Sequence, residues 1–578
     1  MAHIGHDMQA AEDVEKVDKV VTTPAEANEE KPAESETKTD TTTETKTKTK
    51  TNPLNNADFE KLVRETLEKW HIQGVAVAVV DGDDTWAEGY GVAKASTDGS
   101  SANTPVTPST MFYTGSTTKS FTAAAATLLV DDNEKYPQVQ WTTPMNQLIR
   151  EDFVLAEDYA TSHVTLEDVL SNRSGLTGEE LTLGNTNTSI RDYVRLLRHF
   201  TLSKEIRTTW QYCNGLFIAV GHMIEVVTGE AISSFLKRRI WGPLGMASTF
   251  WSLEDAKAYA ADDANDSTLA TPYGWDESAG KHEVIPYFEG VLGGAGAVIS
   301  TVTDYAKYLR CIMRKTEPLS KAGHTALRTP RSLMPGMLPQ LTKQMLYSLG
   351  WMLTTYHGED VMLHPGGIEG MTATMILFPE REWGVLVFSN SDGPGRETLA
   401  WHLIDEMLEV PQDKRIDIYE KEQKKKAESK ERNTKEAALK RLYPTVPSPP
   451  RPLSLSLEDY TGTYKHPAYP EFVVILTPEK TLKINVQGAF PVRIQLDHVS
   501  VDYFLASMFF FRYAPAADLV VRAEFELGVN SKVKRFGAAL DFANMPDTLI
   551  WFDKVGEEDK KEDTVDKEDK DKEDNEER

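Results

Sequence analysis

A proline-rich stretch near residue 450 divides the chain into two parts whose apolar patterns predict different folds. Before it, globular sequence starts near residue 54, the β-branched run Val75–Val80 predicts a strand that a turn joins to a second strand, and mixed helices and loops follow to about residue 410. After it, short segments of alternating apolar residues follow one another, as in Phe472–Leu476, which is typical of an antiparallel barrel or sandwich. Prolines stiffen a linker, so this stretch should separate two folded units. It contains Pro444, Pro447, Pro449, Pro450 and Pro452.

The sequence predicts an α+β domain, in which helices flank an antiparallel sheet, followed by an all-β barrel or sandwich between disordered tails. Residues 37–51 read TKTDTTTETKTKTKT, a polar run that cannot bury apolar surface and is expected to be disordered. We therefore expect a tail at 1–53, the α+β domain at 54–410, a charged and proline-rich linker at 411–454, the all-β domain at 455–555 and an acidic tail at 556–578.

Charge and cysteine content exclude several classes of protein. The 578 residues include 89 acidic and 63 basic side chains, a net charge of −26, which disfavours binding to nucleic acid or to an anionic membrane. Only two cysteines, Cys213 and Cys311, are present, so neither a disulfide scaffold nor a four-cysteine zinc site is expected. Residues 1–20 lack the apolar core of a secretory signal, and no apolar run reaches the length of a membrane span. We expect a cytoplasmic protein.

The first chemical motif is Ser116-Thr117-Thr118-Lys119, which follows Gly115 and precedes an alanine-rich helix. A separation of three residues places the serine and the lysine on the same face of a helix. A neutral lysine amine could then accept the proton of the serine hydroxyl and activate it as a nucleophile. Taken alone the motif is weak, because Ser-x-x-Lys also begins at Ser35, Ser234, Ser278 and Ser531. The alternative is an ordinary helix start capped by Ser116.

Two further motifs lie downstream. Tyr212-Cys213-Asn214 is the only Tyr-x-Asn of the chain and precedes an apolar helix. A tyrosine beside a lysine ammonium can have a lowered pKa and act as general base and acid. His364-Pro365-Gly366-Gly367 precedes two apolar segments that resemble paired strands, and its backbone N–H groups could line an oxyanion hole. The alternatives are a core tyrosine and a loop histidine.

The order of these motifs resembles that of the penicillin-recognising serine enzymes. The resemblance is to the class C β-lactamase branch with its esterase, D-aminopeptidase and transesterase relatives, and it covers about residues 60–410. The C-terminal part resembles the lipocalin-like barrel that some of these enzymes carry. The motifs in question are Ser116-x-x-Lys119, Tyr212-x-Asn214 and His364-x-Gly366.

This resemblance implies a role for each motif residue. Ser116 would become acylated, and Lys119 and Tyr212 would share the transfer of protons. Asn214 would orient Lys119 and the acyl group, and His364 would supply a hydrogen bond where the family usually has a lysine. Gly366 belongs to the same substrate-binding motif. The backbone N–H groups of Ser116 and Gly367 would bind the oxyanion.

The resemblance implies a serine hydrolase that cleaves an ester or amide bond in a small molecule or peptide. Pro365, Gly366 and Gly367 lack the hydroxyls that would bind a β-lactam carboxylate, so esterase, amidase or peptidase activity is favoured over β-lactamase activity. An acyltransferase that uses the same acyl-enzyme and a catalytically silent binding protein remain alternatives. No Gly-x-Ser-x-Gly, Walker or His-Glu-x-x-His motif is present, and we expect no metal and no cofactor. The oligomeric state is not predicted.

Overall fold

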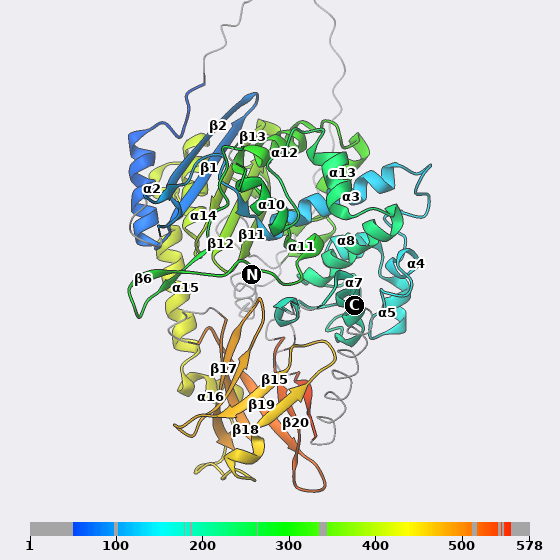
Figure 1. The fold of residues 1–578 in the computed structure, drawn as a ribbon, viewed down its shortest axis with the longest axis vertical. Helices are drawn as coiled ribbons and strands as arrows, with labels where there is room; N and C mark the ends of the chain where they lie inside the picture. Colours follow the sequence, from blue (N-terminus) through cyan, green and yellow to red (C-terminus); the bar gives the residue numbers. More distant parts are fainter. Residues whose placement is uncertain are drawn as a thin grey trace, which may run out of the picture.

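The computed structural model of the chain contains two folded units joined by helices (Figure 1). It describes residues 50–556, except for 97–101, 179, 185, 187, 263, 335–343, 511–516, 542–544 and 546–547. The larger unit is a sheet flanked by helices, and the smaller one is a closed barrel. The predicted α+β fold followed by an all-β barrel is confirmed. The predicted tails lie almost wholly outside the described residues.

Within the described residues, the main sheet has nine strands in the order β3-β2-β1-β13-β12-β11-β10-β9-β8. Two short strand pairs, β4 with β7 and β5 with β6, lie outside it. The strands of this unit are β1 (Gly74–Asp81), β2 (Asp84–Lys94), β3 (Thr104–Pro105), β4 (Phe112–Tyr113), β5 (Tyr273–Asp276), β6 (Lys281–Val284), β7 (Ile299–Ser300), β8 (Ser332–Met334), β9 (Met345–Tyr347), β10 (Met352–Tyr356), β11 (Glu359–Ile368), β12 (Met371–Phe378) and β13 (Trp383–Ser389).

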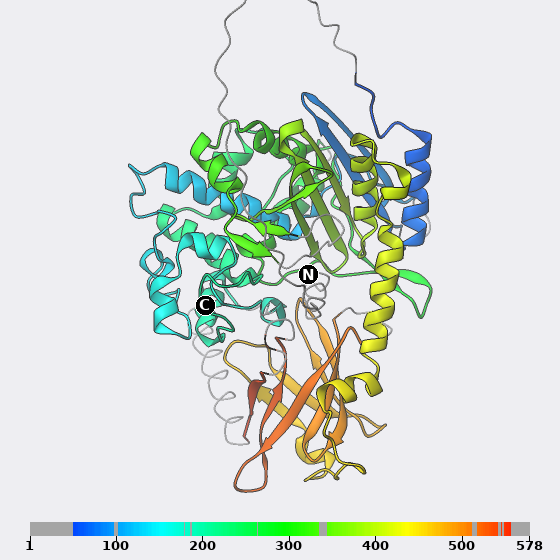
Figure 2. The same ribbon diagram turned by 180° about the vertical axis from the view of Figure 1, so that it is seen from behind.

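Helices cover both faces of this sheet (Figures 1 and 2). The helices of this unit are α2 (Ala57–Lys69), α3 (Thr118–Asp131), α4 (Met145–Leu148), α5 (Asp158–His163), α6 (Leu166–Leu170), α7 (Ile190–Leu196), α8 (Asn214–Thr228), α9 (Ile232–Leu236), α10 (Leu253–Ala260), α11 (Gly293–Gly296), α12 (Val302–Arg314), α13 (Lys321–Arg328) and α14 (Gly395–Met407).

Strand β1 is apolar along nearly its whole length because both of its faces are buried. Side chains of a strand alternate between the two faces of a sheet. Val75, Val77 and Val79 belong to the apolar cluster that includes residues of α2 and α14. The intervening residues Ala76 and Ala78 belong to the cluster formed with the helices of the opposite face. A strand that is buried on both faces needs an unbroken apolar run.

Helix α3 lies in the interior of the larger unit. Every residue from Thr118 to Leu129 is buried, and four consecutive alanines, Ala123 to Ala126, leave room for close neighbours.

In the part of the chain that the structure describes, no single helix has the length and hydropathy to cross a membrane. Only a pair bent by 80°, Asn214–Thr228 with Ile232–Trp241, passes that test together.

Two helices between the units, α15 (Ile418–Arg432) and α16 (Lys435–Leu442), each pack on one of them. Near the start of α15, the Tyr419 ring lies edge-on to the Trp70 ring, with centroids 5.1 Å apart. Lys69 Nζ lies 3.5 Å from the centroid of the Tyr419 ring. In α16, Ala438 is fully buried among apolar side chains of the barrel. Figure 2 shows α15 running along the side of the molecule from the larger unit to the barrel.

The barrel is closed by eight described strands, each paired with its neighbours in sequence and the last with the first. Aromatic rings fill its interior: Phe472 stacks on Phe552 with centroids 4.3 Å apart, and Phe525 lies 4.9 Å from Phe536. The interior is therefore a packed core. The strands are β14 (Gly462–Lys465), β15 (Phe472–Leu476), β16 (Leu482–Val486), β17 (Val492–Ser500), β18 (Tyr503–Phe509), β19 (Leu519–Leu527), β20 (Val533–Ala538) and β21 (Ile550–Lys554).

Candidate active site

Ser116 lies in a tight turn, η2 (Gly115–Thr117), between strand β4 and helix α3. Gly115 adopts a φ of +52°, a left-handed conformation that favours glycine. A Cβ atom at Gly115 would lie 2.5 Å from the backbone nitrogen of Gly367, which excludes any side chain there. The turn thus brings the serine against the end of strand β11.

The Ser116 hydroxyl contacts the two residues that the sequence motifs predicted. Lys119 Nζ donates to Ser116 Oγ over 3.1 Å, and the Tyr212 hydroxyl donates to the same oxygen over 2.7 Å. Lys119 comes from the first turn of α3, and Tyr212 from the segment that leads into α8. Both distances lie within the reach required of an acid–base partner.

Lys119 is fully buried, and its amine also donates to Asn214 Oδ1 over 2.6 Å and to the backbone carbonyl of Ala295 over 2.9 Å. Burial lowers the pKa of Lys119 to about 7, and the nearby carboxylate of Glu180 acts in the opposite direction. A large part of the Lys119 population is therefore neutral near pH 7, as a general base must be.

Tyr212 behaves differently from the sequence-based interpretation, which allowed a lowered pKa. Its side chain is buried, and the loss of solvation raises the pKa of the phenol far above its ordinary value. The hydrogen bond to Ser116 lowers the pKa, but by less than burial raises it. Tyr212 is therefore protonated at neutral pH, which suits a proton donor, and Lys119 is the better base.

Glu180 is a member of this network that the sequence motifs did not predict. It lies in a short 3-10 turn, η3 (Glu180–Gly184), and both carboxylate oxygens accept from Asn214 Nδ2, over 2.8 and 3.1 Å. Because Asn214 Oδ1 accepts from Lys119, the amide links the carboxylate to the lysine. Glu180 lies 34 residues before its partner Asn214 in the sequence, so the two residues do not belong to one short motif.

Asn172 holds the Tyr212 segment from both sides. Its backbone carbonyl accepts from the N–H of Gln211 over 2.8 Å, and its side-chain oxygen accepts from the N–H of Cys213 over 3.2 Å. Its φ of +54° is one that asparagine tolerates better than most residues. No sequence motif predicted this role for Asn172.

Strand β11 leaves one edge open beside Ser116. It pairs with β12 through Gly366 and Gly367, whereas its pairing with β10 ends at Leu363. The open edge packs against η2 so closely that a Cβ at Gly366 would lie 2.0 Å from the carbonyl oxygen of Thr114 and 3.1 Å from the nitrogen of Ser116. The backbone of Gly366 and Gly367 therefore lies directly beside the serine.

His364 is fully buried and uses both ring nitrogens within the protein. Nε2 lies 3.3 Å from the Tyr347 hydroxyl, and Nδ1 lies 2.6 Å from the carbonyl oxygen of Pro365. Since a carbonyl only accepts, Nδ1 carries the proton and Nε2 accepts from Tyr347. Burial and the Lys119 charge lower the pKa of His364 to about 3, so the imidazole is neutral near pH 7.

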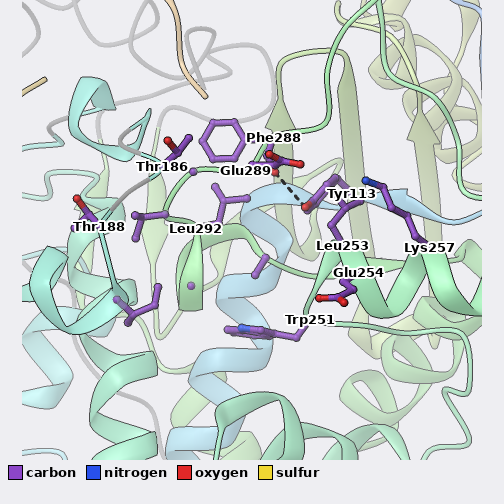
Figure 3. Close-up of a pocket in the computed structure, with 15 residues that line it drawn as sticks. Tyr113, Thr186, Thr188, Trp251, Leu253, Glu254, Lys257, Phe288, Glu289 and Leu292 are labelled. Atoms are coloured by element: carbon purple, nitrogen blue, oxygen red, sulfur yellow. Dashed lines mark hydrogen bonds between the residues drawn. The ribbon is translucent and has the colours of Figure 1, made fainter. Parts of the chain in front are cut away.

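A cavity of about 500 Å³ lies next to this network (Figure 3). One wall includes Leu292 and Gly293, at the start of the helix α11 whose Ala295 carbonyl accepts from Lys119. Figure 3 shows Tyr113, three residues before Ser116, with its hydroxyl bonded to the Phe288 carbonyl over 3.3 Å. Most of the lining is apolar, and the exposed charges lie at the rim: Glu254, Lys257 and Glu289.

No group of three or more His, Cys, Asp and Glu side chains suited to a metal ion exists among the residues that the structure describes.

A sequence model described as "Beta-lactamase" matches residues 59–409. The chain belongs to the β-lactamase family. A second match, to a domain of unknown function, covers residues 446–554, the region of the barrel.

Curated members similar to this chain include two fungal hydrolases. An unguisins hydrolase of Aspergillus campestris is 39% identical over 88% of this chain and 93% of its own length. The unguisins hydrolase of Aspergillus violaceofuscus is 35% identical over 87% of this chain and 91% of its own length. The similarity therefore spans both the β-lactamase domain and the barrel.

Solved structures show the same fold. The octameric penicillin-binding protein homologue from Pyrococcus abyssi superposes with a TM-score of 0.56 at 19% identity, covering 86% of this chain and 99% of that one. The structure of SurE covers 86% of this chain and 98% of its own, with a TM-score of 0.50 and 19% identity. At this identity the likeness concerns the fold alone.

Proposed function

We propose that this member of the β-lactamase family is a serine hydrolase that cleaves an amide or ester bond through an acyl-enzyme on Ser116. The observation that carries the proposal is the position of Ser116 Oγ, 3.1 Å from Lys119 Nζ and 2.7 Å from the Tyr212 hydroxyl. A serine hydroxyl is a weak nucleophile unless a base lies within hydrogen-bond reach, and here the Lys119 amine, whose pKa burial lowers to about 7, lies within that reach.

In the proposed reaction, neutral Lys119 takes the proton of Ser116 while Oγ bonds to the substrate carbonyl carbon. The carbonyl oxygen becomes an oxyanion, and the backbone N–H groups of Ser116 and Gly367 stabilise it. As the bond to the leaving amine or alcohol breaks, Tyr212 donates a proton to the leaving group and regains one from Lys119. Water then attacks the acyl-enzyme, passes its proton back through the same groups and releases the acid.

We further propose that the cavity beside α11 receives an apolar part of a small-molecule or peptide substrate. Trp251, Phe288 and Leu292 line it, and burying such a group contributes about 25 cal/mol per Å² of apolar surface. Amides and esters are favoured over β-lactams because Pro365, Gly366 and Gly367 offer no hydroxyl to a carboxylate. Unguisins, the compounds in the names of the two fungal relatives, are the first substrates to test.

A fluorophosphonate probe tests the proposal, because it labels only an activated serine. We expect the wild-type protein to be labelled and Ser116→Ala to lose all labelling. Ser120→Ala is the matched control: Ser120 is buried in the first turn of α3, which directly follows η2, but its hydroxyl donates to the Thr117 carbonyl over 2.8 Å. A folded wild-type protein that resists the probe would favour the alternative of a silent binding protein, and labelling of Ser116→Ala would move the nucleophile elsewhere.

A further inference from the structure

The barrel touches the larger unit at the turn between strands β16 and β17, and the contact is made by backbone atoms. The N–H of Ala489 donates to the carbonyl oxygen of Gly184 over 2.9 Å. A Cβ at Gly184 would lie 2.9 Å from the nitrogen of Phe490, and a Cβ at Gly488 would lie 2.4 Å from the Gly184 oxygen. We call residues 487–491 the barrel tip. Two glycines allow it to approach the larger unit this closely.

Gly184 is the last residue of η3, the turn whose first residue is Glu180. At that first residue, the Glu180 carboxylate accepts from Asn214 Nδ2, and Asn214 Oδ1 accepts from Lys119. The barrel tip therefore contacts one end of this five-residue segment, and Asn214, which bonds to the proposed general base Lys119, contacts the other end.

The same segment also supports the cavity. The Leu183 carbonyl accepts from the N–H of Val291 over 3.0 Å, and a Cβ at Gly290 would lie 2.3 Å from that carbonyl oxygen. Val291 and Gly290 both line the cavity. A displacement of η3 would therefore move one wall of the cavity together with the partner of Asn214.

A 3-10 turn of five residues has poor internal hydrogen-bond geometry, so its position depends on what packs against it. The barrel is suited to provide such support, because aromatic rings such as Phe525 and Phe536 fill its interior. A second contact between the units, the ring pair Phe200 and Tyr469 with centroids 6.4 Å apart, limits rotation of the barrel about its tip.

We propose that the barrel tip is a positioning element of the active site, which holds residues 180–184 so that Glu180 keeps Asn214 aligned with Lys119 and Leu183 fixes a cavity wall. The proposal rests on the proposed hydrolase function. It assigns the barrel tip a part in turnover and substrate selection that acts through residues 180–184.

The chain offers a matched pair of variants for the test. Gly488 and Gly462 both lie in the barrel, with φ of +134° and +131°, so alanine must adopt a rarely populated φ at either position. At Gly488 the new Cβ would meet the Gly184 oxygen at 2.4 Å, whereas at Gly462 its nearest contact is the flexible end of Lys554 at 3.2 Å. Only Gly488→Ala disturbs the contact with the larger unit.

We expect Gly488→Ala to lower kcat/KM on the order of 10–100-fold, the scale of a small misplacement of catalytic groups, and Gly462→Ala to stay near wild type. The pH profile gives a readout that a loss of stability would not move. The charged or titratable groups around Lys119 are Glu180, Cys213, His364 and Tyr212, whose ring centroid lies 4.7 Å from Lys119 Nζ. If η3 shifts, the Glu180 charge supports the Lys119 ammonium less, and the acidic limb of kcat/KM moves to lower pH, as in Glu180→Gln.

Substrate selection gives the second readout. The ratio of kcat/KM for bulky and small apolar acyl groups should change in Gly488→Ala and not in Gly462→Ala. Ala489→Pro, which removes the N–H donated to Gly184, should reproduce both effects and replaces Gly488→Ala if that variant does not fold. Equal pH profiles and equal selectivity in the tip variants and in Gly462→Ala would overturn the proposal. Failure of the hydrolase function itself would instead appear as an unlabelled Ser116 in the wild-type protein.

Discussion

The Tyr212 hydroxyl donates to Ser116 Oγ over 2.7 Å, and the burial of the Tyr212 side chain keeps this phenol protonated. Lys119, on the other side of the same oxygen, has a pKa lowered to about 7 by burial. Burial disfavours the charged form of each group, so it increases the share of neutral lysine, which can accept a proton, and keeps the tyrosine as a phenol, which can only donate one. The two side chains therefore have different proposed roles.

Tyr212→Phe tests the proposed proton donor. It removes one hydroxyl and leaves the ring, so turnover should fall on the order of 10²–10⁴-fold while substrate binding changes little. If the hydroxyl only satisfies a buried partner, the variant should lose about 1–3 kcal/mol of unfolding free energy and keep its turnover in the folded fraction. Turnover and urea unfolding, measured on the same sample, separate these outcomes. Near wild-type turnover would remove Tyr212 from the mechanism.

The titration of Lys119 predicts the pH dependence of acylation. Only the neutral amine accepts a proton, so the rate of Ser116 labelling should rise with pH through about 7 and level off above it. Glu180 raises the pKa of Lys119, so Glu180→Gln should move this limb to lower pH. Labelling rates between pH 5 and 9 at constant ionic strength check both. A limb unmoved by Glu180→Gln would show that the carboxylate does not act on the base.

The same shift predicts a pH dependence of stability. In the folded protein Lys119 loses its proton near pH 7, whereas in the unfolded chain it keeps the proton to about 10.5. Between these values the unfolded state binds more protons, so the free energy of unfolding should rise with pH relative to a variant without the lysine. Comparison of wild type and Lys119→Met by denaturant unfolding at pH 7 and 9 checks the sign. If the free energy of unfolding changes equally with pH in wild type and in Lys119→Met, the pKa of Lys119 lies near its ordinary value.

Gly115→Ala should abolish labelling of Ser116. The new Cβ would meet the backbone nitrogen of Gly367 at 2.5 Å, so the turn or strand β11 must shift. Gly358→Ala is the control, since Gly358 also has a positive φ, of +86°, but no atom lies within 4 Å of its Cβ position. Labelling of both variants at equal rates would mean that the close approach of η2 and β11 does not matter for the nucleophile.

Filling the cavity should change selectivity and leave the nucleophile intact. Leu253→Trp adds volume at the cavity wall and should raise KM for substrates with large apolar groups, with little effect on acetyl esters or probe labelling. Leu333→Trp provides the control, because Leu333 lies on strand β8 with 63% of its surface exposed. If Leu253→Trp leaves KM unchanged across a series of acyl chain lengths, the cavity is not a substrate site.

Local patterns in the sequence predicted much of the fold because they depend on short-range geometry. The valine run at β1 indicates a strand buried on both faces, and alternating residues indicate the strands of the barrel. The three-residue spacing of Ser116 and Lys119 is enough to bring the two side chains together at the start of α3. The order of the motifs then indicated the family, which the match over residues 59–409 shows.

Tertiary structure alone decided the surroundings of these motif residues. Glu180 reaches Asn214, Asn172 brackets Tyr212, and the barrel tip contacts Gly184, and in each case the partners are distant in sequence and carry no shared pattern. The direction of the Tyr212 pKa shift also depended on burial, which is a property of the packed chain. A motif fixes which chemical groups are present, whereas their desolvation and their long-range partners arise only when the chain folds, because both depend on atoms that the motif does not contain.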